Sequence, residues 1–196
     1  MLTIGLTGKT GAGKSTVAAY LREKGCYIID GDVIARQITE KSSPVLGELQ
    51  KAFGEDILDE KGELIRKRLA ERAFLSRKNT DLLNSITHPA IKKKCEDEIE
   101  RAAKEGYTVS VIDAAALLDS SCKDICDKIV VVTAPEEIRL ERILERDGIT
   151  TEQAMTRIKA QKSDEYYFSY ADIIIRNYPP YDKDESNYNE LRELIN

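Results

Sequence analysis

Tryptophan is absent from this chain of 196 residues, and histidine and cysteine are scarce, with one and four residues respectively. A protein zinc site needs paired Cys or His ligands. His88 is the one histidine, Cys122 and Cys126 are separated by three residues, and no second cysteine pair follows. The sequence therefore contains no zinc-binding pattern. We expect all four cysteines (Cys26, Cys95, Cys122 and Cys126) to be free thiols in a reducing compartment, with a Cys122–Cys126 redox pair as the alternative.

The sequence also lacks a basic surplus and a long apolar run. Its formal net charge is -5 and its pI is near 5.2, whereas broad nucleic-acid binding usually needs a basic surface, so we expect no nucleic-acid partner. No apolar stretch approaches the ~20 residues that span a bilayer. The N-terminus has no basic region followed by a cleavage site. We therefore expect no membrane association and a cytoplasmic location.

A glycine-rich turn lies between the first predicted strand and the first predicted helix. It matches the pattern G-x-x-x-x-G-K-[ST]. Glycines let the backbone wrap a phosphate at the positive end of the following helix, while Lys14 adds a charge and Ser15 offers a hydroxyl to Mg²⁺. A chance glycine turn is the alternative, but a match placed between strand and helix predicts nucleoside triphosphate binding. The residues assigned to this binding are Gly8, Gly11, Ala12, Gly13, Lys14, Ser15 and Thr16.

Strand-like apolar runs alternate with helical patterns along the rest of the chain. The run from Ile129 to Val132 is continuously apolar, which is typical of a strand in a parallel sheet. The alternation predicts an α/β fold of three layers, α/β/α, with a mostly parallel five-stranded sheet and right-handed crossovers. The expected strands are 2–7, 26–29, 107–112, 128–133 and 171–175, and the expected helices are 16–22, from 33, from 44, 66–74, 79–104, 135–146, from 150 or 151 to 162, and 187–194.

No repeat, low-complexity segment or linker divides the chain, so we expect one domain over residues 1–196. The helices of about 43–104 form an insertion on the acceptor side, and a lid is expected over about 135–162. Residues 53–66 are expected to be a loop or short hairpin. We expect the helix 79–104 to be interrupted at His88-Pro89, because proline disturbs a helix at the residues before it.

Two acidic residues follow the second predicted strand. Asp30 and Asp32 lie at its carboxyl end, where open α/β sheets bind their ligands. An acid there can take a proton from an attacking hydroxyl or help to hold Mg²⁺. The alternative is structural, with Asp30 capping the next helix and Asp32 favoured by the helix dipole.

Three arginines lie on one predicted helix, and Arg142 and Arg146 are one turn apart on a shared face, with Arg139 nearby. Such guanidinium groups can neutralise charge on a transferred phosphate. They can equally form a solvated face, because the same helix is rich in glutamate. His88 and the tyrosines at 166, 167 and 170 are more typical of packing than of chemistry.

These motifs, taken in order, resemble the dephospho-CoA kinase family of small P-loop kinases. The phosphate loop is shared with many enzymes, but the Asp-x-Asp and His-Pro motifs in this order are more particular. The matching segments run through nearly the whole chain: Ile4–Gly8, Gly13–Thr16, Ile29–Asp32, Ile34–Arg36, Phe53-Gly54, Gly62, Arg68-Leu69, Leu83-Asn84, His88-Pro89, Ala134–Glu136, Arg142, Arg146, Ala160-Gln161, Ala171-Asp172 and Asn177.

The resemblance implies an ATP- and Mg²⁺-dependent phosphotransferase acting on the ribose 3′-hydroxyl of dephospho-CoA, as a monomer or weak homo-oligomer. Asp32 is then the catalytic base, Lys14 and the loop hold ATP, and Ser15 binds Mg²⁺. Arg142 acts from the lid. The same resemblance implies Arg146 beside Arg142, Asn177 beside the adenine, and Arg36 and His88 at the acceptor.

The chain departs from the family pattern in three places. Ala114–Asp119 replaces a Pro-Leu-Leu-hydrophobic-Glu segment, Tyr167 replaces a basic residue, and Lys9-Thr10 replaces a glycine-hydrophobic pair. Another nucleotide or small-metabolite kinase on the same scaffold therefore stays an alternative, as does a non-catalytic ATP sensor. A GTPase is disfavoured because no Asn-Lys-x-Asp segment is present.

Overall fold

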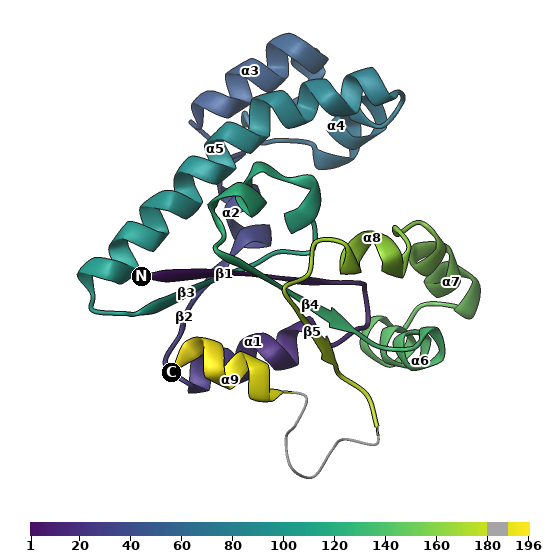
Figure 1. Ribbon diagram of the computed structural model, residues 1–196. Helices are drawn as coiled ribbons and strands as arrows, with labels where there is room; N and C mark the ends of the chain where they lie inside the picture. Colours follow the sequence, from purple (N-terminus) through teal and green to yellow (C-terminus); the bar gives the residue numbers. More distant parts are fainter. Residues whose placement is uncertain (180–187) are drawn as a thin grey trace.

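The computed structural model describes residues 1–179 and 188–196, and Figure 1 shows a central sheet with helices on both sides. No helix within these two ranges is both long and apolar enough to cross a membrane. The elements are β1 (Leu2–Gly8), α1 (Lys14–Glu23), β2 (Tyr27–Asp30), α2 (Gly31–Gln37), α3 (Pro44–Phe53), η1 (Glu55–Ile57), α4 (Arg66–Ala73), α5 (Arg77–Lys104), β3 (Val109–Asp113), η2 (Leu117–Asp119), η3 (Ser121–Ile125), β4 (Lys128–Thr133), α6 (Glu136–Asp147), α7 (Thr151–Lys159), α8 (Asp164–Phe168), β5 (Ile173–Arg176) and α9 (Asn189–Ile195).

The sheet has five strands in the order β2-β3-β1-β4-β5, and every neighbouring pair is parallel. The predicted α/β fold with a five-stranded parallel sheet is therefore confirmed. β1 occupies the centre because its residues are buried along nearly the whole strand. The loop after Gly8 consequently emerges at the middle of the carboxyl edge, between the ends of β3 and β4.

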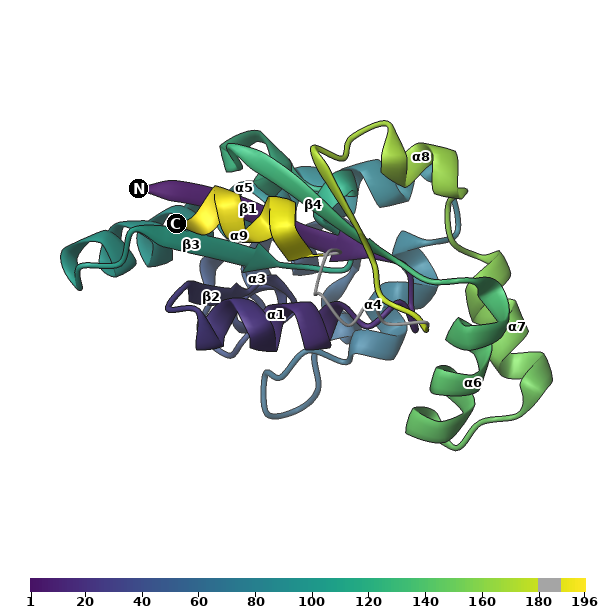
Figure 2. The same cartoon turned by 60° about the horizontal axis from the view of Figure 1, so that its bottom comes forward.

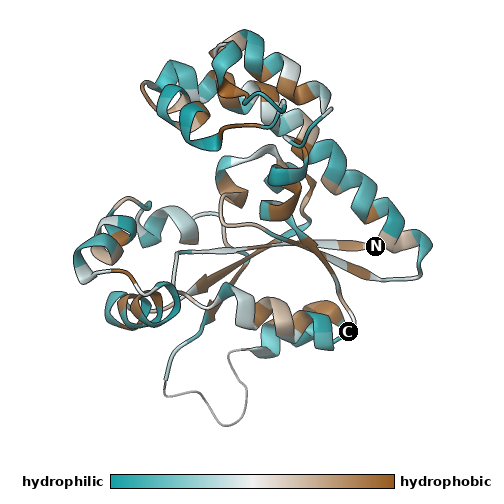
Figure 3. Ribbon diagram, turned by 180° about the vertical axis from the view of Figure 1, so that it is seen from behind, coloured by the Kyte–Doolittle hydropathy of each residue, from teal (hydrophilic) through white to brown (hydrophobic). Residues whose placement is uncertain are grey.

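Buried apolar residues lie on both faces of the sheet, and parts of its strands are brown in Figure 3. On one face, residues such as Ile4, Leu6 and Val130 pack against α1 and α9. On the other, Ile112 and Val131 pack against the helical insertion and η2. Alternate residues of a strand point to opposite faces, so both helical layers bury apolar surface against the same strands. This packing forms the three layers.

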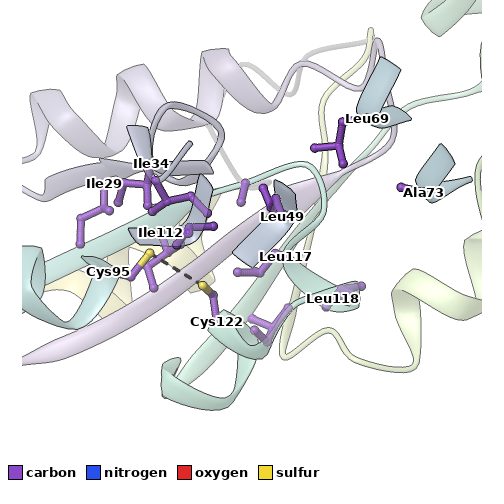
Figure 4. Close-up of a cluster of buried hydrophobic side chains, with 14 of the residues drawn as sticks. Ile29, Ile34, Leu49, Leu69, Ala73, Cys95, Ile112, Leu117, Leu118 and Cys122 are labelled. Carbon is purple, nitrogen blue, oxygen red and sulfur yellow. Dashed lines mark hydrogen bonds between the residues drawn. The ribbon is translucent and has the colours of Figure 1, made fainter. Parts of the chain in front are cut away.

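The insertion-side core contains two of the cysteines, and Figure 4 shows Cys95 beside Cys122. Their sulfur atoms are 3.7 Å apart, and all four cysteines are free thiols, as predicted. The Cys126 thiol donates to the carbonyl oxygen of Cys122. The Cys122 sulfur thus lies beside a thiol of α5, while Cys126, its partner in the alternative of a redox pair, bonds to its backbone.

The predicted interruption at His88-Pro89 is wrong, since α5 continues from Arg77 to Lys104 with Pro89 inside it. A proline removes one backbone hydrogen bond and strains the preceding turn. Tertiary packing offsets that cost here, because Leu83, Ile86, Ala90 and Ile91 of the same stretch all pack against the core. Propensity is a weak guide when a helix is held by burial.

Residues 53–66 form a compact connection, as predicted, with η1 and an antiparallel bridge between Leu58 and Leu64. Helix α8 was not predicted. The last helix was expected over 187–194 and is observed as Asn189–Ile195, while Asn187 lies outside the described residues.

Helices α6 and α7 project from one end of the molecule in Figure 2, within the segment predicted to be a lid. They share a small apolar core of Ile143, Ala154 and Ile158. Thr150 is the N-cap of α7 and forms a reciprocal capping box with Gln153. The pair therefore has a core of its own beside the sheet.

Candidate functional site

The glycine-rich turn has the backbone conformation that its sequence predicts. Gly11 and Gly13 adopt φ values of 78° and 88°, in the left-handed region that favours glycine. Gly13 is the N-cap of α1, which starts at Lys14 without a side-chain cap. The first N–H groups of a helix have no carbonyl partner within it, so they are available to phosphate oxygens.

Neighbouring segments hold the outer side of this turn. Arg142 of α6 donates from Nη1 to the carbonyl oxygens of Gly11 and Ala12, both at 3.2 Å. Asn177, which follows β5 and is buried, donates from Nδ2 to the carbonyl oxygens of Ala12 and Gly13 at 3.2 and 3.3 Å. A Cβ at Gly13 would lie 1.9 Å from that amide nitrogen, so this close approach requires glycine.

Lys14 points to the end of the adjacent strand, where its Nζ pairs with the carboxylate of Asp113. Burial raises the pKa of Asp113, and the nearby acids Asp30 and Asp32 raise it further, while Lys14 opposes the shift. The net shift is upward because burial outweighs the ion pair. A partly buried carboxylate thus lies beside the phosphate loop, and Lys14 offsets the cost of its burial only in part.

The two acids after β2 have different environments. The carboxylate of Asp30 caps α2 by accepting a 2.8 Å hydrogen bond from the N–H of Val33, which is the structural alternative weighed above. Asp32, one residue inside α2, is exposed and lines the cavity at the phosphate loop. Gly31 allows this tight turn against β3, since a Cβ there would lie 2.8 Å from the Cβ of Ala114.

A cavity of about 720 Å³ lies along the loop between Asp32 on one side and α6 on the other. It brings together most of the residues predicted for the site. Three of them, Ala12, Arg36 and His88, do not line it. The side chain of Ala12 is fully buried in the core beside α1. The lining residues are Gly8, Lys9, Thr10, Gly11, Gly13, Lys14, Ser15, Thr16, Asp32, Ala115, Arg142, Glu145, Arg146, Gln161 and Asn177.

Arg146 is held at the edge of this cavity by an acid. Its Nε and Nη2 donate to both carboxylate oxygens of Asp147 at 2.7 and 2.9 Å, and Arg157 donates to the same carboxylate at 2.7 Å. Arg146, with help from Arg157, holds the pKa of Asp147 below its ordinary value. The predicted role of Arg146 in nucleotide binding is therefore left to its other N–H groups, unless it exchanges this partner.

The predicted acceptor residues lie on two helices, Arg36 on α2 and His88 on α5. Arg36 is exposed on α2, and its carbonyl oxygen accepts a 3.3 Å hydrogen bond from Arg66 of α4. Behind them is a second cavity of about 230 Å³ with mainly apolar walls. Its lining residues are Ala35, Ile38, Thr39, Leu64, Arg66, Leu69, Ala70, Phe74, Leu83, Thr87 and Ile91.

His88 lines neither of these two cavities. Burial lowers the pKa of its imidazole, with Asp119 opposing that shift. Its carbonyl oxygen accepts a 3.3 Å hydrogen bond from the Ser121 hydroxyl. Asp119 in turn accepts a 2.9 Å hydrogen bond from Tyr166, and burial together with that bond raises the pKa of the tyrosine to about 12. His88 thus joins α5 to η3.

Several residues that the structure places at the site had no role assigned from the sequence, and three of them form side-chain contacts there. Asp113 is the partner of Lys14, Lys9 pairs with Asp164 at 2.6 Å, and the Gln161 side chain accepts a 3.0 Å hydrogen bond from the N–H of Thr10. Asp113 had a usable signal, because it directly follows the strand predicted at 107–112, at the ligand-binding edge of a parallel sheet. The other two depend on tertiary contacts.

The oxygen donors near the loop fit Mg²⁺. No cluster of three or more His, Cys, Asp or Glu side chains suited to a metal occurs in residues 1–179 and 188–196. Mg²⁺ bound with a nucleotide needs no such cluster, because phosphates and waters complete its coordination around one or two protein oxygens. The Ser15 hydroxyl and the Asp113 carboxylate are suitable donors.

Comparisons with known proteins match one family over nearly the whole chain. The family model described as dephospho-CoA kinase matches residues 2–181. A dephospho-CoA kinase of Corynebacterium diphtheriae is 46% identical over 177 residues, which cover 90% of this chain and 88% of that protein.

Solved structures agree with this match. A crystal structure of a Thermus thermophilus protein superposes with a TM-score of 0.80 at 26% identity, covering 98% of this chain and 95% of that one. The dephospho-CoA kinase of Campylobacter jejuni has the same fold, with a TM-score of 0.68 at 24% identity over 98% of this chain and 96% of that one.

Proposed function

This chain belongs to the dephospho-CoA kinase family, and we propose that it catalyses the ATP-dependent phosphorylation of the ribose 3′-hydroxyl of dephospho-CoA, which gives coenzyme A. The observation that carries the proposal is the shared cavity. One acid, Asp32, faces the same space as the phosphate loop and Arg142. A kinase of a hydroxyl acceptor needs a base and a phosphate site in that relation.

In this mechanism Asp32 accepts the proton of the 3′-hydroxyl. The freed oxygen forms a bond to the γ-phosphorus, and the bond from that phosphorus to the β–γ bridging oxygen breaks, so that ADP leaves. Lys14 exchanges Asp113 for the phosphates, and Arg142 adds positive charge from α6. Positioning and charge neutralisation supply most of the rate enhancement, because the protein forms no covalent bond to either substrate.

In this proposal the Ser15 hydroxyl and the Asp113 carboxylate would hold Mg²⁺, with Asp113 becoming available when Lys14 turns to the phosphates. The bound ion would supply charge neutralisation at the phosphates. Asp113 is suited to this role because its carboxylate is partly buried at the end of β3, where burial is the main cause that raises its pKa. A cation bound there would offset that cost of burial.

The acceptor lies in this proposal across α2. Arg36 is exposed on α2 four residues after Asp32, and Arg66 donates to its carbonyl oxygen. Guanidinium groups in this region would suit a diphosphate. The mainly apolar cavity behind them suits the pantetheine arm, which is long and largely uncharged. The roles of Arg36 and of the insertion 43–104, the lid 135–162, the cytoplasmic location and the oligomeric state stay predictions.

The test is a coupled ADP-release assay with ATP and Mg²⁺ that compares dephospho-CoA with adenosine, AMP and no acceptor, with product mass checked for one added phosphate. We expect strong turnover with dephospho-CoA alone. Asp32→Asn should bind ATP normally and lose about 10²- to 10⁴-fold in kcat. Asp30→Asn is the matched control, because that carboxylate caps a helix, and it should retain kcat.

The outcomes separate the alternatives. Turnover with another acceptor would favour a kinase of different specificity. ATP binding without any transfer in the wild-type protein would favour a nucleotide sensor. Equal kcat for Asp32→Asn and wild type would reject Asp32 as the base.

A further inference from the structure

Arg139 of α6 is a buried cation, and two of its three guanidinium nitrogens lack a hydrogen-bond acceptor among the described residues. The residue is 3% exposed, and neither its Nε nor its Nη1 has a hydrogen-bond partner among the described residues. A buried charge normally has a partner, because removing it from water is costly and only pairing offsets that cost. The mechanism proposed for phosphate transfer does not explain why the charge of Arg139 is buried without compensation.

The other arginines on this face of α6 are bonded. Positions 139, 142 and 146 are three, four and seven residues apart, so their side chains leave the helix on one side. Arg142 donates to the carbonyl oxygens of the phosphate loop, and Arg146 donates to Asp147. Because the other two arginines of this helix face have acceptors, the lack of acceptors at Arg139 depends on where its side chain lies.

That place is the outer side of the phosphate loop. A Cβ added to Gly11 would lie 2.6 Å from the carbonyl oxygen of Arg139 and 3.0 Å from its Cβ. The Arg139 side chain therefore starts in contact with the loop. Its charge also reaches Tyr167 of α8, where it opposes the rise that burial causes in the tyrosine pKa.

The nearby carboxylates do not neutralise this cation. Asp164, which begins α8 and is also close enough to affect Tyr167, pairs with Lys9 at 2.6 Å. Asp119 accepts the hydroxyl proton of Tyr166. The phosphate loop itself is ready to bind several negative charges, and it lies directly against Arg139.

We propose that Arg139 is an electrostatic binding residue for the triphosphate, acting from behind the phosphate loop, and that its buried charge is compensated when phosphates fill the loop. Charges in a buried site are screened less than those at the surface, so the attraction acts through the loop. The inference rests on the proposed function, since it requires that the loop bind ATP. It adds a residue that touches no substrate atom.

Two opposite effects follow for Arg139→Met, which keeps an unbranched side chain and removes the charge. The ligand-free variant should be more stable, because replacing an unpaired buried charge by an apolar group removes its desolvation cost. Its affinity for ATP should fall. A residue with a merely structural role would lose stability on substitution and would affect all ligands alike.

The experiment measures Kd by titration calorimetry for adenosine, ADP and ATP, with Mg²⁺ and without acceptor, together with the melting temperature of the ligand-free proteins. For Arg139→Met we expect the Kd for ATP to rise about tenfold, the Kd for ADP about threefold, and the Kd for adenosine to stay unchanged. These factors are those expected from the loss of one charge on the order of 10 Å from the phosphates. The ligand-free melting temperature should rise by about 2–4 °C. Arg139→Lys, which keeps the charge, should bind ATP within about threefold of wild type.

Arg22→Met is the matched control, because Arg22 is exposed at the far end of α1 and its charge is screened by water. It should leave all three affinities unchanged. Equal weakening of adenosine and ATP by Arg139→Met, unchanged ATP affinity, or a variant that melts lower or fails to fold would each overturn the inference. Absence of ATP binding by the wild-type protein would instead reject the proposed function itself.

Discussion

Replacing Asp113 by Asn separates magnesium binding from the stability of the ligand-free protein. Asp113 ends β3, is paired with Lys14 and lies in register with Asp30 on the neighbouring strand. Burial and the two other acids raise its pKa, while Lys14 lowers it. The ion pair is thus largely offset by desolvation and repulsion, so we expect Asp113→Asn to change the ligand-free melting temperature by at most about 2 °C.

The effect on magnesium should be much larger. Loss of a carboxylate that holds or orients a bound metal typically costs about 10- to 100-fold in metal affinity. The assay is ADP release at saturating ATP and dephospho-CoA over a series of Mg²⁺ concentrations. We expect the concentration for half-maximal velocity to rise by that factor in Asp113→Asn.

Asp30→Asn provides the comparison, since both acids end adjacent strands but Asp30 is committed to capping α2. Its loss should lower stability by about 1 kcal/mol or less, because Asn is also a good cap, and leave the magnesium dependence unchanged. The reasoning is wrong if Asp113→Asn keeps the wild-type magnesium dependence, or if Asp30→Asn shifts it as strongly.

Three further changes test the acceptor side. Gly31→Ala should lower kcat/KM by about tenfold through its clash with Ala114, and activity should return in the double variant with Ala114→Gly; no recovery would disprove the clash. Ala70→Trp should fill the apolar cavity and raise the KM for dephospho-CoA by about tenfold, with the KM for ATP as the internal control. Burial lowers the pKa of His88, so its stabilising contribution is present above the unfolded value of about 6.5 and is lost as pH falls through the folded value. Melting curves should therefore show a smaller loss between pH 7.5 and 5 for His88→Gln than for wild type.

Much of the fold could be read from local patterns. The strand predicted at 128–133 has those same bounds in the structure, because a continuous apolar run buried on both faces leaves no other assignment. The start of α3 was equally clear, with Ser43 as N-cap and Pro44 in the first turn. Such elements carry their signal within a few residues.

The failures come from contacts between distant segments. Pro89 was expected to break a helix, and only the burial of α5 against the core explains why it does not. Helix α8 is five residues long, so its periodicity is too short to detect. The pairs Lys14–Asp113 and Thr10–Gln161 join residues far apart in sequence, and no local pattern indicates them.

Contacts on the outer side of the phosphate loop also indicate a role for Asn177 in orienting the loop. The placement of this residue beside the adenine, which the resemblance implies, stays a prediction. Its amide also donates to the carbonyl oxygens of Ala12 and Gly13. In a trans peptide the carbonyl of one residue and the N–H of the next point in opposite directions. Fixing those two carbonyls therefore turns the N–H groups of Gly13 and Lys14 away from Asn177. Both residues line the main cavity, so we expect Asn177 to act on ATP by orienting the loop that binds its phosphates.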